Sequence, residues 1–525
     1  MKNGTRAGMW TRRRVVQGGL AGIGALALAP MVLPKYAAAA TMPDPDKILD
    51  TIKPGNYVPK KYLEQFGLGP DSVLWDPKKD WIRTADWESI RSRFAGQTVR
   101  FAVGAADADS VQATLKPFKQ LSGIDVEVIS IPDASFYTKA VSAFVSGSAR
   151  FDALEYFSPW LGDFSAPGFL HELGDYVDKY KLPYQDFADT YWQNYALYSD
   201  KGVFGIPYDC DFKMFMVRNK QFKQYVGHAA SPKDTVKTWD DVVHFAKTLN
   251  KPDAHMHGIG YMGGRGFWST YTWEHIAAQY GLDLLDSDWK PKIVSDAGIK
   301  AVEILVELKK YAPQGIENWG WADDRSAWLG GQLAMNMAWQ DQANQATRPD
   351  QSRISGDEPV ALYEPRGTGP DARFAPPNLA GSTASIAANA RNPEAAFVML
   401  AFFTTASLQA MNGASANGVA PGFMSVIENE NFQKIMPPSK IWGESLPYAW
   451  AEPRIPGMYQ LETTLGLELN KVIAGDAKPK EALQAASKRW EEILRRKGFY
   501  GSKPPVDYSV IHDRMWLGRG KKALV

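Results

Sequence analysis

The pattern of one segment, residues 98–129, predicts the fold class of this chain. Thr98–Val103 is a β-branched run, Ser110–Leu121 has the apolar spacing of an amphipathic helix, and Ile124–Ile129 alternates apolar and polar residues. Two strands that are joined by a helix run parallel in one sheet. Segments of both kinds recur along the chain, which predicts an α/β fold.

The chain is too long for a single hydrophobic core. It has 525 residues, of which 45% are hydrophobic and 22% charged, and this composition also excludes a disordered chain. Four short segments pair turn residues with a brief extended run, as crossings between two lobes do: Gly205–Tyr208, Asn378–Ser382, Asn417–Gly422 and Pro453–Pro456. Repeated crossings make each lobe discontinuous in sequence. The expected parts are a leader (1–40), an N-terminal extension (41–95), lobe I (96–208 and 383–418), lobe II (209–382 and 419–500) and a C-terminal tail (501–525).

The leader has the order of a secretory signal. Arg12, Arg13 and Arg14 precede an apolar run, Gly18–Leu33, and a zone of small residues, Ala37–Ala40. This order resembles a twin-arginine signal peptide, which is removed after export. A membrane anchor is the alternative, but a run of 16 residues is shorter than the roughly 20 that a spanning helix needs. We therefore expect a mature chain that is free in the periplasm.

Composition excludes several classes of function. Seven histidines and one cysteine are scattered along the chain, so we expect no metal site, no iron–sulfur cluster and no other cofactor. The formal net charge is +1, but the leader alone carries six basic groups and no acidic one. The remaining chain has 53 basic and 58 acidic groups, a net charge of −5. Because it has no stripe rich in Lys and Arg, we expect no nucleic-acid partner.

Four further stretches identify a family. They are Phe118–Val128, Val203–Lys220, Gly330–Trp339 and Gly475–Leu483. In order and spacing they resemble the family 1 extracellular solute-binding proteins, the maltose-binding-protein-like carbohydrate receptors of ABC importers. The resemblance implies the type II periplasmic binding protein fold, in which two discontinuous lobes enclose a ligand cleft. It also implies two partners, a small-molecule carbohydrate and the membrane permease subunits of an ABC importer, for a monomeric protein that is not an enzyme.

Carbohydrate recognition requires flat aromatic faces beside polar groups that bind hydroxyls. Most of the 18 tryptophans pack in cores, but Trp339 follows an apolar run and precedes Asp341, a polar partner. Trp268 and Thr270 lie between a glycine-rich segment and a predicted helix, and the resemblance makes both positions ligand-facing. Two more aromatic candidates, Tyr156 and Trp160, follow the third predicted strand of lobe I.

Carboxylates supply the acceptors for sugar hydroxyls. Asp209 and Asp211 flank Cys210, so both carboxylates lie on one side of an extended segment, and the resemblance favours Asp211. The alternative function is an exported carbohydrate-active enzyme that uses the two as acid and base. Neighbours on one strand face diverge too little to stand on opposite sides of a glycosidic bond, which favours binding.

Four weaker candidates complete the predicted site. Asp107 and Asp109 follow the first strand of lobe I, with solvated loop acids as the alternative. Arg454 precedes Ile455 and is either a hydrogen-bond donor to the ligand or part of an ion pair between the lobes. Gly381 lies in the second crossing.

Export should depend on Arg12 and Arg13. Lysine keeps the charge of arginine but lacks its planar guanidinium fork. We expect the double variant Arg12→Lys/Arg13→Lys to remain in the cytoplasm as precursor, as measured by cell fractionation and immunoblotting. An unchanged periplasmic yield would contradict a twin-arginine signal.

Overall fold

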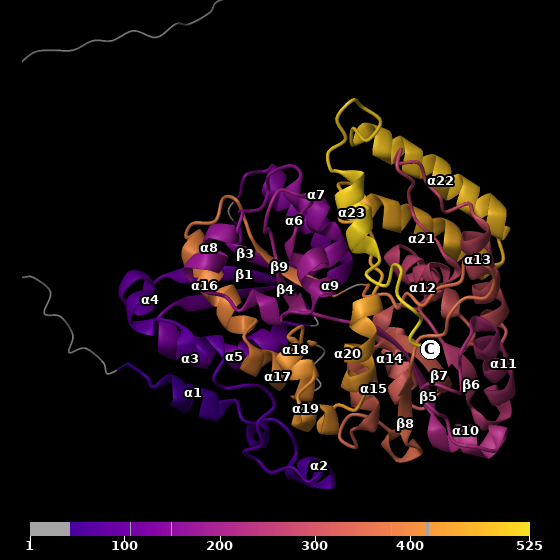
Figure 1. Ribbon diagram of the computed structural model, residues 1–525, viewed down its shortest axis with the longest axis horizontal. Coiled ribbons are helices and arrows are strands. Elements are labelled where there is room, and N and C mark those ends of the chain that lie inside the picture. The colour runs from indigo at the N-terminus through magenta and orange to yellow at the C-terminus, as the bar shows by residue number, and fades with distance from the viewer. Residues whose placement is uncertain (1–41, 106, 149, 380, 416–418) are drawn as a thin grey trace, which may run out of the picture. The chain divides into compact units, whose positions relative to one another are not determined.

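The computed structural model describes residues 42–525, except residues 106, 149, 380 and 416–418 (Figure 1). The predicted signal peptide therefore lies outside the described residues. Two β-sheets, each covered by helices, organise the rest of the chain.

The first sheet has five strands in the order β2-β1-β3-β9-β4. Their bounds are β1 Thr98–Gly104, β2 Asp125–Ile131, β3 Ala153–Phe157, β4 Ile206–Asp209 and β9 Ser382–Ile386. Strand β1 pairs in parallel with β2 and β3, whereas β9 is antiparallel to both β3 and β4. Helix α5 (Ala108–Ser122) joins β1 to β2 and ends at Gly123, whose φ of 72° is left-handed. The predicted strand–helix–strand unit is thus confirmed.

The second sheet has four strands in the order β6-β7-β5-β8. Their bounds are β5 Lys213–Arg218, β6 His257–Gly260, β7 Leu333–Trp339 and β8 Pro359–Leu362. Every residue of β5 and β7 is buried. Because the chain leaves the first sheet at β4, builds the second, and returns at β9, the predicted two-lobed α/β architecture with discontinuous lobes is confirmed.

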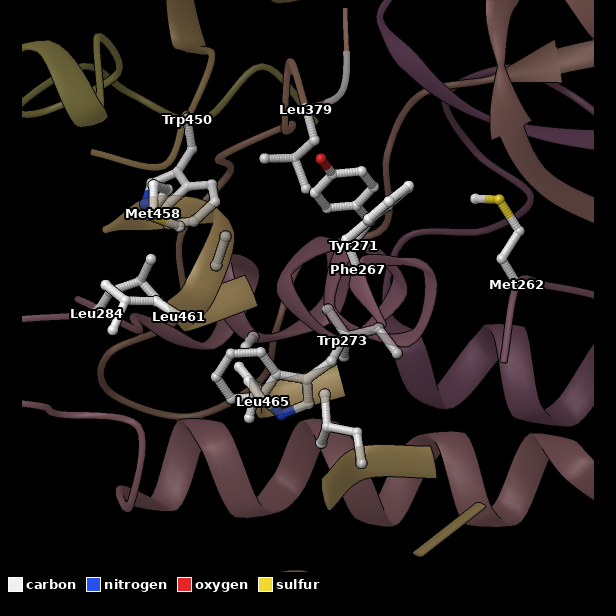
Figure 2. Close-up of a cluster of buried hydrophobic side chains, with 14 of the residues drawn as sticks. Met262, Phe267, Tyr271, Trp273, Leu284, Leu379, Trp450, Met458, Leu461 and Leu465 are labelled. Atoms are coloured by element: carbon white, nitrogen blue, oxygen red, sulfur yellow. The ribbon is translucent and has the colours of Figure 1, made fainter. Parts of the chain in front are cut away.

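Helices packed beside the second sheet bury large apolar side chains. Helix α12 (Phe267–Ala277) packs against α13 (Asp296–Lys309) and α21 (Met458–Ala474), and α21 packs against α22 (Pro479–Arg496). Trp273 is fully buried and donates its indole N–H to the Gly298 carbonyl at 2.9 Å. Figure 2 shows Trp273 of α12 beside Leu465 of α21. Burial of such large side chains stabilises the region because each removes a wide apolar surface from water.

The other described α-helices are between 3 and 13 residues long. They are α1 Pro45–Thr51, α2 Lys60–Gln65, α3 Trp81–Thr84, α4 Trp87–Phe94, α6 Asp133–Val145, α7 Leu161–Ser165, α8 Gly174–Lys179, α9 Asp189–Tyr191, α10 Asn219–Val226, α11 Trp239–Leu249, α14 Trp321–Leu329, α15 Gln340–Thr347, α16 Pro393–Phe403, α17 Ala406–Ser415, α18 Met424–Ile427, α19 Glu430–Ile435, α20 Pro438–Ser445 and α23 Tyr508–Met515. In the described part of the chain, no single helix is long and apolar enough to cross a bilayer, and only α16 with α17, bent by 53°, meets that test as a pair.

The N-terminal extension is attached to the first lobe through a buried carboxylate. Asp80 is 0% exposed. Its Oδ1 accepts hydrogen bonds from the Ile82 N–H at 2.9 Å and the Thr405 hydroxyl at 3.0 Å, and its Oδ2 accepts from the Ser407 N–H at 2.7 Å. The bonds to Thr405 and Ser407 join the start of α3 to the segment between α16 and α17.

The C-terminal tail also packs on the folded body. Ile511 and Met515 of α23 are buried, and Trp516 pairs with Trp450 in an antiparallel bridge. The guanidinium group of Arg373 lies 4.6 Å from the centre of a Trp516 ring. The tail is therefore part of the folded structure.

Removal of the Asp80 carboxylate should destabilise the protein. Asp80→Ala leaves two backbone N–H groups and one hydroxyl without an acceptor in a buried place. We expect the free energy of unfolding to fall by about 3 kcal/mol, as measured by denaturant titration followed by tryptophan fluorescence.

Asp86 provides the matched control. It is exposed and caps α4 through a single hydrogen bond from the Ser89 N–H at 3.0 Å. Asp86→Ala should therefore cost about 1 kcal/mol. Equal losses for the two variants would contradict a structural role of the buried carboxylate.

Candidate functional site

A cavity of about 430 Å³ lies where elements of both lobes meet. From the first sheet it is lined by the ends of β1, β3 and β4 and by the start of β9. From the second lobe it is lined by Trp339 at the end of β7, Trp268 of α12 and the start of α14. In open α/β sheets the carboxyl ends of the strands are where ligands bind. Its position and size make this cavity the candidate site.

Seven carboxylates line the cavity: Asp107, Asp133, Glu155, Asp209, Asp211, Asp323 and Asp341. None of the described residues that line it is Lys, Arg or His. Acidic groups that share one small cavity repel each other unless a ligand or a proton compensates their charge.

The end of β4 and the segment that leads to β5 carry two of these carboxylates. Asp209 ends β4, and its Oδ1 accepts a hydrogen bond from the Ala420 N–H at 2.7 Å. Asp211 accepts from the Gln340 side-chain amide at 2.9 Å, while the carbonyl oxygen of the same amide accepts from the Phe212 N–H at 2.5 Å. Gln340 directly follows β7, so one amide fixes the Asp211 loop to the end of the second sheet.

Two further carboxylates line the cavity, one from each lobe. On the first sheet, Glu155 of β3 accepts a hydrogen bond from the Gly104 N–H at the end of β1 at 2.9 Å. On the second lobe, Asp341 is 6% exposed, and its Oδ1 has no hydrogen-bond partner. Its Oδ2 accepts a long bond of 3.4 Å from Gln345, and the backbone N–H groups of Gln342 and of Asp341 itself stabilise the ionised carboxylate.

Burial raises the pKa values of several carboxylates in the cavity, and repulsion between neighbours adds to the shift for some of them. Burial raises the pKa of Glu155 to about 7, against the hydrogen bond from Gly104, and burial raises the pKa of Asp341 to about 7 although Arg325 opposes it. The pKa values of Asp209 and Asp211 lie well above the ordinary aspartate value, first because of burial and then because of the neighbouring carboxylates. The unliganded site therefore holds protons near neutral pH.

Aromatic rings form the other walls of the cavity. Trp268 and Trp339 lie edge to face, with ring centres 6.4 Å apart and planes at 79°. Tyr156, Phe157 and Trp321 also line the space. Flat rings beside carboxylates are the combination that binds the C–H faces and the hydroxyls of sugars and polyols.

Trp339 is held by a hydrogen bond and by a buried ammonium group. Its indole N–H donates to the Leu379 carbonyl at 3.2 Å. The Lys213 ammonium lies 4.9 Å from the Trp339 ring centre and is 1% exposed. Burial lowers the pKa of Lys213 to about 8, although nearby carboxylates, Asp324 and Glu364 first among them, oppose the shift. Lys213 does not line the cavity.

The structure brings seven of the twelve predicted ligand residues together. They are Asp107, Tyr156, Asp209, Asp211, Trp268, Trp339 and Asp341, and all of them line the cavity. Their role in ligand binding stays a prediction. The opposed sheet ends, rather than the linear order of the chain, bring these residues to one place.

Three other predicted residues lie outside the cavity, in a buried polar layer. Trp160 donates to the Glu462 carboxylate at 3.1 Å, and the Thr270 hydroxyl donates to the Glu462 carbonyl at 2.8 Å. Arg454 pairs with Glu452 at 3.2 Å and donates to the Ser158 hydroxyl at 2.9 Å. These side chains support the elements that surround the cavity.

The last two predicted residues, Asp109 and Gly381, do not line the cavity either. Asp109 is exposed in the first turn of α5. A side chain at Gly381 would collide with the Tyr195 hydroxyl and the Asp209 carbonyl, so glycine is required there by the close approach of two crossings.

The sequence patterns missed several residues that line the cavity, chiefly Asp133, Glu155 and Trp321. Glu155 had a usable signal, because it is a charged residue inside an otherwise apolar, buried strand. Asp133 follows Pro132 at the start of α6 and had no signal beyond that of an ordinary first-turn acid. Across the described ranges, no three His, Cys, Asp or Glu side chains are arranged to hold a metal ion.

Comparisons with known proteins place this architecture in a family. The profile of the bacterial extracellular solute-binding proteins matches residues 103–410, and the chain belongs to that family. It is 24% identical over 418 residues to a probable amino-acid ABC transporter periplasmic-binding protein of Sinorhizobium fredii, covering 78% of this chain and 92% of that protein. It is also 24% identical to a mannitol-binding protein of Pseudomonas aeruginosa, over 57% of this chain and 70% of that protein.

A solved structure has the same fold. The ABC transporter solute-binding protein of Agrobacterium radiobacter K84, solved in complex with ribitol, superposes with a TM-score of 0.68 at 22% identity. The match covers 76% of this chain and 99% of that protein. The two-lobed fold is therefore that of the periplasmic binding proteins.

The raised pKa values predict that unliganded protein loses stability as pH rises. Unfolded Asp and Glu lose their protons near about pH 4, whereas Glu155 and Asp341 in the folded state lose theirs near pH 7. Between these values the folded state binds more protons, so the free energy of unfolding falls with increasing pH. We expect the Tm to fall between about pH 5 and about pH 7.5.

One substitution should flatten this dependence. Asp341→Asn removes a group that must ionise in the cavity, and we expect it to reduce the loss of stability by on the order of 2 kcal/mol. Glu127→Gln, an exposed change on β2, is the control and should leave the slope unchanged. Equal slopes for Asp341→Asn and wild type in thermal denaturation would contradict the shifted pKa.

Proposed function

We propose that this chain is the substrate-binding protein of an ABC importer, and that it captures a sugar or polyol in the cavity between its lobes and delivers it to the membrane permease. The observation that carries this proposal is the pairing of Trp268 and Trp339 with the carboxylate cluster at the strand ends of both lobes. The proteins of similar sequence and fold that bind mannitol or ribitol support a ligand of this class.

The size of the cavity supports a small ligand. A volume of about 430 Å³ lies at the lower end of the range for small-molecule sites, roughly 300–1,000 Å³, which suits a polyol, a monosaccharide or a short oligosaccharide. Ligand contacts from both lobes favour the closed form, because only a ligand with higher affinity for one form shifts the equilibrium.

Binding without turnover is the preferred chemistry. Asp209 and Asp211 lie two residues apart on one short crossing, and the charge of Asp211 adds to burial in raising the pKa of Asp209. Glycoside hydrolysis instead requires two carboxyl groups that face each other across the bond, at about 5 Å or more. We accordingly propose that the protein has no enzymatic activity, and that it works as a monomer in the periplasm after twin-arginine export.

Replacement of Trp339 tests the receptor function. Trp339→Ala removes an aromatic wall, and we expect the affinity for the tightest binder in a panel of polyols, monosaccharides and disaccharides to fall by about 2 kcal/mol or more. Trp339→Phe retains a ring and should lose less. Isothermal titration calorimetry measures both, and an unchanged affinity of Trp339→Ala would contradict the proposed site.

The variant Asp211→Asn tests whether the protein is a receptor or an enzyme. A charge-assisted hydrogen bond to the ligand becomes a neutral one of about half the strength, so we expect a small but clear loss of affinity. No product should appear with wild type or variant when an oligosaccharide is incubated and assayed for reducing ends. Release by wild type that Asp211→Asn abolishes at unchanged affinity would show that the protein is an enzyme.

A further inference from the structure

We propose that the ligand carries a protonated amino group, so that the site selects an amino sugar or an amino polyol over its neutral counterpart. This inference rests on the proposed function and names the chemical class of its ligand. It is carried by the charges that line the cavity, by one unpartnered carboxylate oxygen and by the aromatic walls.

All charged side chains among the described residues that line the cavity are acidic. Seven carboxylates line it, and no cationic side chain is among the described residues that do so. Two cationic groups near the cavity do not line it, and each has another contact, although the charge of Arg325 lowers the pKa of Asp341. Lys213 lies over the Trp339 ring, and Arg325 donates to the Gln345 side chain at 2.7 Å. With a neutral ligand these carboxylates have to keep their protons, whereas an ammonium group allows them to ionise and compensates their charge directly.

Asp341 presents an acceptor that the protein does not use. Its side chain is more than nine-tenths buried, it lines the cavity, and its Oδ1 has no hydrogen-bond partner. A buried carboxylate oxygen without a donor is costly, so a bound donor is strongly favoured at this position. An ammonium group brings three N–H donors and a positive charge, and a hydroxyl brings one neutral donor.

The carboxylates act on each other across the lobes. The charge of Asp341 raises the pKa of Asp107, Asp209 and Asp211, which belong to the first lobe or to the crossing. The charges of Glu155 and Asp133, on the side of the first sheet, raise the pKa of Asp107 further. One cation bound among them is therefore attracted by several carboxylates at once, and its attraction pulls both lobes toward the same point.

The aromatic walls suit the same ligand. Trp268, Trp321 and Trp339 line the cavity, and indole faces attract both the C–H groups of a sugar and an adjacent cation. A bare metal ion is the competing occupant. Among the residues that the structure describes, no group of three acidic, His or Cys side chains has an arrangement for a metal ion, so we favour the organic amine.

Binding of a cation should release protons. Burial raises the pKa values of Asp107, Asp133, Glu155, Asp209, Asp211 and Asp341 in the empty site, and a positive ligand stabilises the ionised form, so these pKa values fall on binding. Tyr156 also faces these six carboxylates, and Asp324, Lys213 and Arg325 lie behind the cavity wall. Affinity should therefore rise with pH as long as the amine stays protonated, and a neutral ligand should release fewer protons.

Matched ligands test this inference on the full mature chain. The probes are 1-amino-1-deoxy-D-sorbitol against D-sorbitol, and D-glucosamine against D-glucose and N-acetyl-D-glucosamine. Isothermal titration calorimetry in two buffers of different ionisation enthalpy gives both the affinity and the number of protons released. We expect the amine of at least one pair to bind about tenfold or more tightly than its neutral counterpart, with proton release. Its affinity should increase between about pH 5 and about pH 7.

Two variants locate the effect. Asp341→Asn should reduce the preference for the amine by about tenfold while the neutral counterpart changes less, because it removes charge but keeps a hydrogen-bonding group of the same shape. Glu127→Gln makes the same change of net charge outside the cavity and should retain the full preference. Far-UV circular dichroism confirms that each variant is folded.

The outcomes separate the two proposals. Neutral ligands that bind as tightly as their amines would overturn the preference for a cation and leave the proposed function standing. Magnesium or calcium chloride alone, if either binds in the calorimeter and displaces the sugar, would overturn the amine in favour of a metal ion. If no sugar, polyol or amino derivative binds at all, both the inference and the proposed function are wrong.

Discussion

The passage of the chain from the first sheet to the second is the constraint on which the site depends. Only three residues, Cys210–Phe212, separate the last residue of β4 from the first residue of β5. Asp209 is bonded to Ala420 on the third crossing, and Phe212 is bonded to Gln340 beyond β7. Because so short a segment connects the two sheets, the strand ends of the two lobes lie close together, and the cavity lies at these strand ends.

Other crossings pack on this segment so closely that side chains are excluded. A Cβ at Gly422 would collide with the sulfur of Cys210, and a Cβ at Gly381 would collide with the Asp209 carbonyl. This explains why a small, buried thiol stands between two carboxylates, where burial and those neighbours raise its pKa well above the ordinary cysteine value. Such a thiol is a packing group and a poor nucleophile.

Local patterns predicted the fold better than the site. The first strand–helix–strand unit depends on apolar spacing and on a helix-ending glycine, both of which are short-range signals. Trp339 was predicted from the apolar run before it and the polar residue after it, and Asp211 from its place in an extended segment together with the family resemblance, whereas Glu155 was missed. Its position in the cavity depends on the pairing of β1 with β3, and no local pattern specifies which strands pair. Conversely, Trp160 and Arg454 have the right chemistry for a ligand but are already hydrogen-bonded to glutamates.

The cavity and the buried layer behind it differ in the charged side chains that they contain. Behind Trp339, buried carboxylates such as Glu452 are accompanied by cations: Arg454 pairs with Glu452, and Lys213 lies near Glu364 and Asp324. These cations offset part of the buried charge in that layer, but both carboxylate oxygens of Glu274 have no hydrogen-bond partner there, and burial and then Glu452 raise its pKa. Among the described residues that line the cavity, the only charged side chains are carboxylates, although the ammonium group of Lys213 lies 4.9 Å from the centre of the Trp339 ring. The layer thus contains cations of the chain's own, whereas the lining of the cavity leaves room for a cation that arrives from outside, and the energy released when that cation binds is available to hold the two lobes together.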